Sequence, residues 1–441
     1  MKLTIEKIIY GGLGLARIPE SEGDAAGKRI FVPFTLPGES VEAELAETAR
    51  SKNNRGFVQG RWTRVLESSP QRTQPACPHF MHCGGCHLQH AESATQAEIK
   101  RSVLFESLER AGVKKIPTIA SLTGSPLAYR NRARVQLQHK PEFRLGYRES
   151  GSHALADVEQ CPVLAPVLQR ALHALLTLGR SGEIPTSMEE IELFTNHDAS
   201  ALLLSIFSSG SPSQSQEPFL SFCATAAAML PELCGAAVIL RAEEIHRTAG
   251  TPWLRWQQQE LLYRVGAFAY HVSLGSFFQV NQELLPEFAA LVTDARSGGV
   301  AWDLYAGVGL FARRLAERFA QVIAVEIAPT AVNDLQKNLF GLPAAIAPAT
   351  TENFLRHALA QRTTAPDLAL LDPPRAGLGM QTATLLAQCR PRSIVYVSCD
   401  PATLSRDVKT LVESGYCLDR LHMVDLFPQT YHQETVAVLQ R

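Results

Sequence analysis

The stretch Ala301–Phe311, AWDLYAGVGLF, decides the fold class of this 441-residue chain. It joins a short apolar strand to a helix through a turn that holds Gly307 and Gly309. Such a turn lets a ligand approach the backbone closely, and the helix N-terminus adds a favourable dipole. Similar apolar strands, separated by helical segments, follow at 321–326, 368–374 and 392–398. This alternation predicts an α/β domain with a Rossmann-like, doubly wound parallel sheet, whose ligand site lies at the carboxyl ends of the strands.

The turn also indicates which cofactor binds there. Glu326 ends the next strand, about 20 residues downstream, where an acid can accept hydrogen bonds from ribose hydroxyls. Position 312 is Ala, so the third glycine of a G-x-G-x-x-G fingerprint is missing, and the Lys of a phosphate-binding loop is missing as well. A nucleoside without a pyrophosphate is therefore favoured over NAD or ATP, which points to S-adenosylmethionine.

Two further strand ends carry reactive side chains. Asp372 follows one strand in DPPRAGL, where it either reaches the ligand crevice or caps a rigid turn. Cys399 follows the next strand in SCDP, and a thiolate there could add to C6 of a pyrimidine and so activate C5. The segments 421–427 and 435–441 are predicted to form an antiparallel hairpin. Glu434, in the loop between them, is the candidate base that removes the C5 proton.

A second group of cysteines has a different pattern. Cys77, Cys83 and Cys86 lie within ten residues around a Gly-Gly turn, and Cys161 in EQCPVL could complete a set of four thiols. A tetrahedral zinc site and a [4Fe–4S] cluster both use such a set. The C-x5-C-x2-C spacing is not the paired C-x2-C of zinc ribbons, which favours the cluster. The remaining cysteines stand in apolar contexts and are predicted to be structural: Cys223, Cys234, Cys389 and Cys417.

The chain length and the strand pattern predict three domains. Residues 1–66 contain short strands at 2–9, 29–34, 41–49 and 54–66, which suggests a five-stranded barrel that closes its own edges. A mixed α+β domain is expected at 75–270 and the ligand-binding α/β domain at 271–441. A helix is predicted over 91–112, with Gly112 as its C-cap.

Charge gives little indication of a partner. Lys and Arg number 42 and Asp and Glu 43, so the formal net charge is −1 and any basic surface must be local. The run 100–150, with eleven basic residues and four acidic ones, is the candidate, although a solvated charged surface is the commoner meaning of such a run. The sequence has no signal peptide and no apolar run of membrane-spanning length, which predicts a cytoplasmic protein.

Five blocks of sequence, taken together, resemble the RNA uracil-C5 methyltransferase family, and they occur in the family's order. The blocks are SFFQVNQ at 276–282, DLYAGVGLF at 303–311, LLDPPRAGL at 370–378, VSCDPATLSRD at 397–407 and FPQTYHQETVAVL at 427–439. YGGLGLAR and VPFTLPGE resemble the family's oligonucleotide-binding TRAM domain, and CPHFMHCGGCHLQH resembles the cluster motif of its ribosomal RNA branch. The resemblance covers nearly the whole chain.

The resemblance implies a monomeric enzyme that methylates C5 of a uridine in RNA, with 23S rRNA as the expected substrate. Cys399 is then the nucleophile and Glu434 the base. The positions that match contacts to S-adenosylmethionine are Gln279, Tyr305, Glu326 and Asp372, and those that match ligands of a [4Fe–4S] cluster are Cys77, Cys83, Cys86 and Cys161. It further implies that the helix at 91–113 packs on the catalytic domain and that the basic strand at 129–137 lies beside the RNA.

Three other functions stay open. A tRNA uridine C5 methyltransferase would use the same chemistry, and a non-catalytic RNA-binding iron–sulfur protein would retain only the fold. A radical enzyme is disfavoured because the C-x3-C-x2-C spacing of that chemistry is absent. Leu310 departs from ribosomal members that have Asn directly after the second glycine of the cofactor turn, so one cofactor contact is expected to be replaced.

Overall fold

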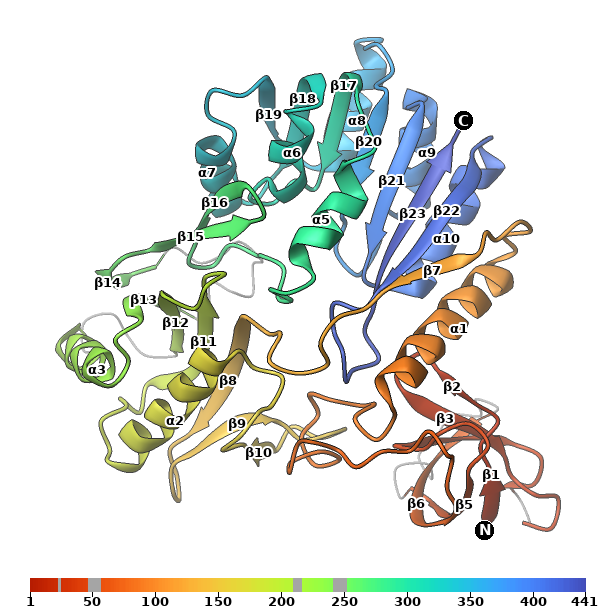
Figure 1. Ribbon diagram of the computed structural model, residues 1–441, viewed down its shortest axis with the longest axis vertical. Helices are drawn as coiled ribbons and strands as arrows, with labels where there is room; N and C mark the ends of the chain where they lie inside the picture. The colour runs from red at the N-terminus through yellow and green to blue at the C-terminus, as the bar shows by residue number, and fades with distance from the viewer. Residues whose placement is uncertain (23–24, 47–56, 209–215, 241–251) are drawn as a thin grey trace.

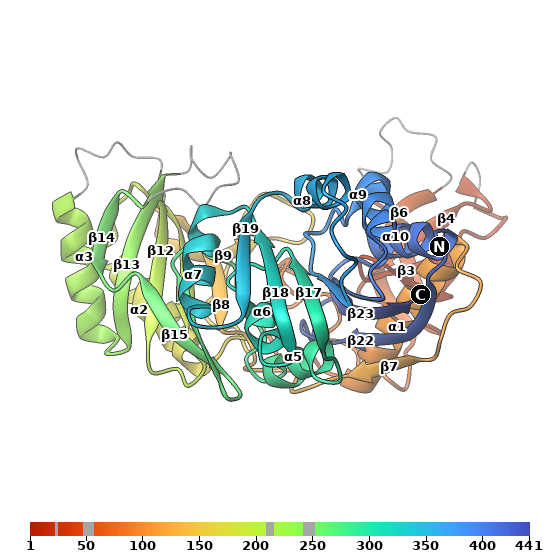
Figure 2. The same cartoon turned by 90° about the horizontal axis from the view of Figure 1, so that it is seen from above.

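The computed structural model of the chain describes residues 1–22, 25–46, 57–208, 216–240 and 252–441. The C-terminal α/β domain lies at the top of Figure 1, with the central domain and the N-terminal β domain below it on either side. Seen from above, the central and N-terminal domains lie at opposite ends, with the C-terminal sheet between them (Figure 2). Within the described ranges, no helix has the length and apolar character needed to cross a membrane.

The N-terminal domain is a curled sheet with the strand order β1-β5-β6-β4-β3-β2. Its strands are β1 (Lys2–Thr4), β2 (Lys7–Ile9), β3 (Leu13–Arg17), β4 (Arg29–Pro33), β5 (Ser40–Leu45) and β6 (Phe57–Glu67). The predicted strand over 2–9 is split at Ile5 and Glu6, so that its halves stand at the two ends of the sheet order. The Ile5 N–H donates to the Glu39 carbonyl at 2.9 Å and the Glu6 N–H to that of Leu15 at 2.8 Å, which brings the two edges together. The predicted strands at 41–49 and 54–66 partly lie outside the described residues.

The segment between the first two domains adds to the C-terminal sheet. The predicted helix is present as α1 (Ser93–Ala111), and Gly112 ends it with a φ of +90°, as a left-handed C-cap. α1 packs against α10 (Pro401–Glu413). The chain then enters β7 (Ile119–Leu122), which pairs in parallel with β22 (Cys417–Val424) at the edge of the C-terminal sheet.

The central domain is a mixed sheet in the order β10-β9-β8-β11-β12-β13-β14. The strands are β8 (Arg132–Gln138), β9 (Arg144–Arg148), β10 (Leu155–Asp157), β11 (Met188–Thr195), β12 (Leu202–Ser208), β13 (Leu233–Leu240) and β14 (Leu254–Gln257). α2 (Pro166–Arg180) and α3 (Gln216–Met229) pack on this sheet and on each other, and their apolar sides share its core. The hairpin of β15 (Glu260–Val265) and β16 (Phe268–Ser273) leads to the C-terminal domain and shares the core of that domain.

The C-terminal sheet has the order β19-β18-β17-β20-β21-β23-β22-β7. Its remaining strands are β17 (Gly298–Leu304), β18 (Phe319–Glu326), β19 (Ala344–Pro348), β20 (Leu368–Leu371), β21 (Ser393–Ser398) and β23 (Glu434–Gln440). Pairing is parallel from β19 to β21, whereas β23 is antiparallel to both β21 and β22. The predicted parallel sheet and C-terminal hairpin are therefore confirmed.

Two layers of helices cover this sheet. α5 (Leu285–Thr293), α6 (Leu310–Leu315) and α7 (Pro329–Asn338) contribute to one apolar core. α8 (Thr351–Ala360), α9 (Gly379–Cys389), α10 and α1 contribute to the core on the opposite face. The connections leave the carboxyl ends of β17, β20 and β21 at one edge, which is where the sequence placed the ligand site.

The cysteines predicted to be structural do not all pack inside. Cys223 and Cys389 are buried and Cys234 is half-buried, but Cys417 is exposed. The prediction for Cys417 is wrong because β22 is buried only toward its carboxyl end, so the first residues of this strand face solvent.

Candidate active site

The register between β21 and β23 brings Cys399 and Glu434 together. Ser398, the last residue of β21, pairs with Thr435, the second residue of β23. Cys399 and Glu434 are the neighbours of this last pair, one just beyond the end of β21 and the other at the start of β23. Glu434 is also near enough to raise the pKa of the Cys399 thiol. The pairing of β21 with β23 therefore brings the thiol and the carboxyl together.

Burial favours the neutral form of both members of the pair. The pKa of Cys399 is raised to about 12, chiefly by burial and then by the nearby Glu434, while Arg375 opposes both. Glu434 is 4% exposed, and burial together with Asp372 holds the pKa of its carboxyl well above the ordinary value. Among the described residues the Glu434 Oε2 atom has no hydrogen-bond partner. The carboxyl oxygen is thus available to a ligand.

Two more carboxyls, from Asp303 and Asp372, extend this acidic region. Asp372 directly follows β20, and burial raises the pKa of its carboxyl to about 7. Asp303 lies within β17 and is fully buried, and burial followed by the charge of Asp372 raises its pKa to about 8. Neither Asp303 oxygen has a hydrogen-bond partner within the described part of the chain. Asp303 was not among the residues predicted from the sequence, although an acid inside an apolar strand was a usable signal.

The predicted cofactor turn is built from strained and glycine residues. Tyr305 has a φ of +74°, which a non-glycine residue rarely adopts, and Gly309 has a φ of +93° as the N-cap of α6. The Glu326 carboxylate accepts a hydrogen bond from the Gly307 N–H at 2.9 Å. It also accepts hydrogen bonds from the N–H groups of Ile327 and Ala328, both at 2.7 Å. Glu326 thus spans the turn after β17 and the start of α7. Strain of this kind is typical of ligand sites.

Gln279 approaches from a separate segment, between β16 and α5. The Asn131 N–H donates to the Val280 carbonyl at 2.9 Å, and the Asn131 side-chain amide donates to the Gln279 carbonyl at 3.1 Å. Gln279 is buried. It lies at the junction between the central and C-terminal domains and so can contact a ligand that spans the two.

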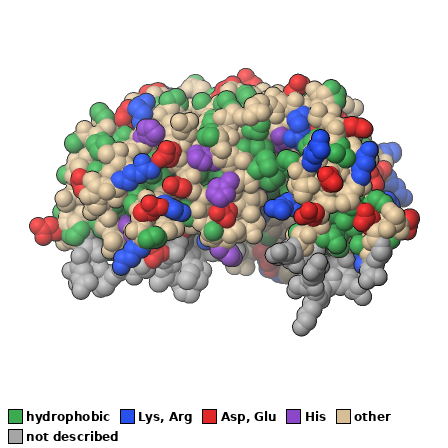
Figure 3. Space-filling view, turned by 90° about the horizontal axis from the view of Figure 1, so that it is seen from below, with side chains coloured by type: hydrophobic (Ala, Val, Ile, Leu, Met, Phe, Trp, Pro, Cys, Tyr) green, Lys and Arg blue, Asp and Glu red, His purple; other side chains and the backbone are tan. Residues whose placement is uncertain are grey.

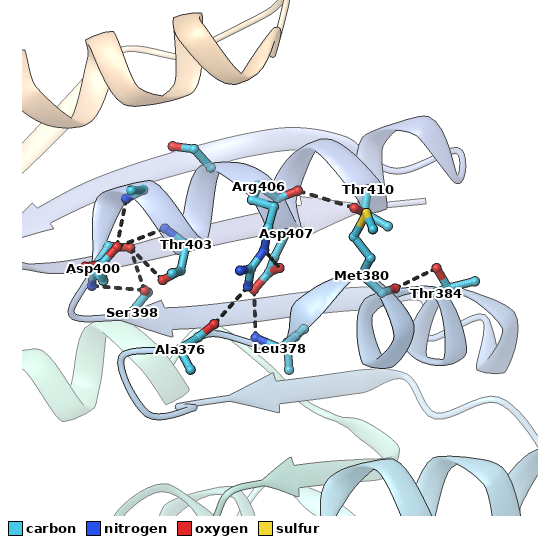
Figure 4. A network of polar contacts seen from close by, with 12 residues as sticks. Ala376, Leu378, Met380, Thr384, Ser398, Asp400, Thr403, Arg406, Asp407 and Thr410 are labelled. Carbon is cyan, nitrogen blue, oxygen red and sulfur yellow. Dashed lines mark hydrogen bonds and ion pairs between the residues drawn. The ribbon is translucent and has the colours of Figure 1, made fainter. Parts of the chain in front are cut away.

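The DPPRAGL loop is fixed to α10 by a network of polar contacts (Figure 4). The Thr403 hydroxyl donates to the Arg375 carbonyl at 3.0 Å. The buried Asp407 carboxylate accepts from the Leu378 N–H at 2.7 Å and from the Tyr396 hydroxyl at 2.8 Å. The loop therefore presents Arg375, an exposed cation whose charge acts on Cys399 and Glu434. The sequence alone gave no role to this arginine.

The N-terminal domain reaches the same site. The Tyr10 hydroxyl donates to the Asp400 carboxylate, next to Cys399, at 3.0 Å. The Tyr10 ring lies edge-on to the Tyr431 ring with centroids 5.4 Å apart, and the His87 ring lies 4.7 Å from that of Tyr431. Aromatic rings from three distant segments of the chain, Tyr10, His87 and Tyr431, thus lie together near Cys399.

The four cysteines of the second group converge from two segments. Burial raises the pKa of the Cys161 thiol to about 12, and the nearby Cys86, Cys77 and Cys83 raise it further. The Cys161 thiol also contacts the partly buried Tyr147. Over the described ranges, the structure has no group of His, Cys, Asp or Glu with the spacing of a single bound metal ion. The thiols are neighbours without the tight packing that one tetrahedral ion imposes.

The basic run at 100–150 is not one continuous basic surface. Lys100 is 1% exposed and bonded to Asp425, so the expectation is wrong for this residue. Several other basic residues of the run form ion pairs: Arg101 with Glu98, Arg110 with Glu106, Arg134 with Glu190 and Arg144 with Glu142. On the face shown in Figure 3, Lys and Arg are interspersed with Asp and Glu. Only Glu190 and Asp425 could not be predicted as partners from the sequence, because they lie far from Arg134 and Lys100 in the chain, whereas the other three pairs lie within four residues of each other.

Several known proteins are similar to this chain. The family model described as tRNA (uracil-5-)-methyltransferase matches residues 352–441. The 23S rRNA (uracil(1939)-C(5))-methyltransferase RlmD of Pectobacterium atrosepticum is 31% identical, over 99% of this chain and 93% of that protein. The protein of the same name from Klebsiella pneumoniae is 32% identical, over 100% and 95% of the two chains. A solved structure, the tRNA (uracil-54, C5)-methyltransferase of Pyrococcus abyssi in complex with S-adenosyl-L-homocysteine, is 22% identical, with a TM-score of 0.75 over the whole of both chains.

Proposed function

The chain belongs to the RNA uracil-C5 methyltransferase family, and on that premise we propose that it methylates C5 of one uridine in 23S ribosomal RNA, with S-adenosylmethionine as the methyl donor. The observation that carries the proposal is the pairing of β21 with β23, which brings Cys399 and Glu434 together at the end of the ladder. Methylation of a uracil carbon needs such a pair, because a nucleophile must add to C6 before C5 can attack a methyl group, and a base must then remove the C5 proton.

Ribosomal RNA is preferred as the substrate because of the names of the similar proteins. The relatives from two species, which match over nearly their full length, are named as methyltransferases of 23S rRNA. The solved tRNA-methylating structure is only 22% identical and supports a common fold alone. Methylation of a tRNA uridine is therefore the second candidate function.

We place the methyl donor along the carboxyl ends of β17, β18 and β20, with four side chains as contacts: Gln279, Tyr305, Glu326 and Asp372. S-adenosylmethionine carries a positive sulfonium and an ammonium group. The carboxyls of the buried Asp303 and the half-buried Asp372 suit such a ligand, since a nearby positive charge favours their ionised forms. The methyl donor supplies an electrophilic methyl group to the site.

In the proposed reaction the Cys399 Sγ atom, as a thiolate, bonds to C6 of the uracil, and the electrons of the C5–C6 double bond form an enolate. C5 of this enolate attacks the methyl group of the sulfonium, the S–CH3 bond breaks, and S-adenosylhomocysteine leaves. C5 then carries both a methyl group and a proton. The Glu434 carboxylate removes that proton, the C5–C6 double bond forms again, and Cys399 leaves as a thiolate. One methyl group thus replaces one proton on the base.

The protonation states of Cys399 and Glu434 indicate that the methyl donor binds before the reaction begins. The free site holds a neutral thiol, because the pKa of Cys399 is about 12, and the pKa of Glu434 is also well above its ordinary value. Arg375 lowers both, and a cationic methyl donor acts in the same direction. We therefore infer that the thiolate and the carboxylate form once the donor is bound.

We propose that Cys77, Cys83, Cys86 and Cys161 hold a [4Fe–4S] cluster. The donor set fits, because four half-buried thiols from two segments converge and raise one another's pKa, so a cation is needed to keep them ionised. Stoichiometric zinc in anaerobically purified protein, without visible cluster absorption, would overturn this assignment.

We also propose that the N-terminal domain is an RNA-binding OB fold of the TRAM type. Its sheet meets edge to edge at Ile5 and Glu6, as a barrel of this kind does. Tyr10 borders the site beside Asp400 and could stack on a base of the RNA. This domain, rather than the run at 100–150, then supplies part of the RNA contact.

The test incubates the full chain with labelled S-adenosylmethionine and either 23S rRNA or tRNA fragments, and maps the methylated uridine. Cys399→Ala should abolish methyl transfer and retain RNA binding. Glu434→Gln should accumulate a covalent protein–RNA adduct on denaturing gels, because the C5 proton stays in place. Methyl transfer by Cys399→Ala contradicts the covalent mechanism, and label in tRNA alone makes the second candidate the function.

A further inference from the structure

The loop 425–433, which joins β22 to β23, ends at Glu434 and is held by the two segments that carry the four cysteines. We propose that these segments and α1 form a clamp that positions Glu434, so that the state of the four-thiol site is transmitted to the base. This inference rests on the proposed role of Glu434. The clamp consists of residues 86–88, 128–130 and α1, together with their bonds to this loop.

Gln429 is the loop residue with the most hydrogen bonds to the clamp. It has a φ of +70°, a conformation that a non-glycine residue adopts only when its surroundings impose it. Its carbonyl accepts hydrogen bonds from the N–H groups of His87 and Leu88, both at 2.9 Å. The buried Gln96 of α1 accepts from the Gln429 N–H at 2.9 Å and donates to its side-chain oxygen at 3.0 Å. Four hydrogen bonds thus fix one residue, five positions before the base.

One helical turn further along α1, Lys100 holds the start of the same loop. Its ammonium group donates to the Asp425 carboxylate at 2.6 Å and to the Phe427 carbonyl at 3.0 Å. Lys100 is buried, and an ammonium group in such a place persists only when it is paired. Gln96 and Lys100 therefore fasten both the middle and the beginning of the loop to one rigid helix.

Both cysteine segments reach this loop through the backbone. His87 directly follows Cys86, so the two N–H groups that bind Gln429 lie one and two peptide units beyond a proposed ligand. On the other side, the carbonyl groups of the two residues after Cys161 accept hydrogen bonds from the N–H groups of residues 128 and 130, at 2.9 and 3.0 Å respectively. Between these two, the buried Tyr129 donates its hydroxyl to the Pro428 carbonyl at 3.0 Å. A group that ties Cys86 to Cys161 therefore ties the two arms of the clamp together.

The catalytic test compares Gln96→Ala with Gln388→Ala, a matched change at an exposed glutamine of α9. A misplaced base should slow loss of the C5 proton, so kcat for Gln96→Ala should fall on the order of 10- to 100-fold with KM for RNA and for the methyl donor unchanged. The covalent adduct should accumulate as it does in Glu434→Gln. Turnover of Gln96→Ala at the rate of Gln388→Ala, or a loss of activity without adduct, overturns the proposal.

Hydrogen exchange tests whether a change at the four-thiol site reaches the loop before Glu434, and this measurement does not depend on catalysis. In the anaerobic full chain, Cys86→Ser and Cys161→Ser should each speed amide exchange in 425–434 by about tenfold or more, because the arms are no longer tied together. Cys417→Ser, at the exposed cysteine, is the control and should leave this exchange unchanged. Equal exchange in all three variants contradicts the clamp. If Glu434→Gln traps no adduct, the proposed mechanism fails, while the exchange result still decides on the clamp.

Discussion

Replacing Asp303 by Asn should change how the stability of the protein depends on pH. The carboxyl of Asp303 is fully buried and its two oxygens have no hydrogen-bond partner within the described residues. Burial and the nearby Asp372 raise its pKa from the ordinary 3.8 to about 8. Between these values the folded protein holds the proton and the unfolded chain does not. Stability contributed by this group is therefore lost as the pH rises through that window.

The magnitude follows from the size of the window. While only the folded state holds the proton, each pH unit lowers the free energy of unfolding by about 1.4 kcal/mol. From pH 5 to pH 7 the wild-type chain should lose about 3 kcal/mol through Asp303. The Asp303→Asn variant has no proton to lose, so the difference in free energy of unfolding between the two proteins should grow by this amount. Any constant cost of burying the amide cancels in that comparison.

The assay is urea unfolding of both proteins at half-unit steps from pH 5 to pH 8, followed by a signal from the C-terminal domain. Glu413→Gln is a suitable control, because that side chain is 67% exposed on α10 of the same domain. Its stability should run parallel to the wild type. Parallel curves for Asp303→Asn as well would refute the reasoning and show that Asp303 is ionised in the folded protein at pH 7.

Three further changes test other contacts of the site. Lys100→Met should lower the free energy of unfolding by about 3–5 kcal/mol, because it leaves Asp425 charged and buried; Lys100→Met with Asp425→Leu should regain most of that loss in the same urea assay. Tyr396→Phe should lower the free energy of unfolding by about 1–3 kcal/mol, since it removes a hydrogen bond to the buried Asp407, and an unchanged unfolding midpoint would contradict this contribution. Arg375→Met should move the acidic limb of the pH–rate profile up by about one unit, because Arg375 lowers the pKa of Cys399 and Glu434; an unmoved limb would exclude that influence.

The α/β domain and the C-terminal hairpin were predictable because both depend on local pattern. Strands buried on both faces appear as short apolar runs, and the segments around Cys399 and Glu434 end or begin such runs. The helix ending at Gly112 was predictable for the same reason, since its C-cap glycine is adjacent to it in sequence. The approach of Cys399 to Glu434 was not predictable in this way, because it depends on the pairing of β21 with β23, and α10 and β22 separate these two strands in the chain.

The features that could not be predicted from the sequence depend on contacts between distant segments. Lys100 was expected on a basic surface, but its partner Asp425 lies 325 residues away in the chain. The splitting of the first strand at Ile5 depends on Glu39 and Leu15, which no local pattern identifies. Asp303 differs from these, because a carboxyl inside an apolar strand contradicts the pattern around it, and that contradiction could have marked it as part of a site.

The pairing of β7 with β22 has a practical consequence for anyone who wishes to express the catalytic part alone. A fragment that starts at residue 271 would lack β7 and α1, and so would expose the free backbone edge of β22 and the apolar side of α10. Bare sheet edges recruit other chains, so such a fragment should aggregate or form intermolecular sheets. A soluble excised enzyme would have to carry residues 93–122 on a linker, as a fragment assembled from two separate stretches of the chain.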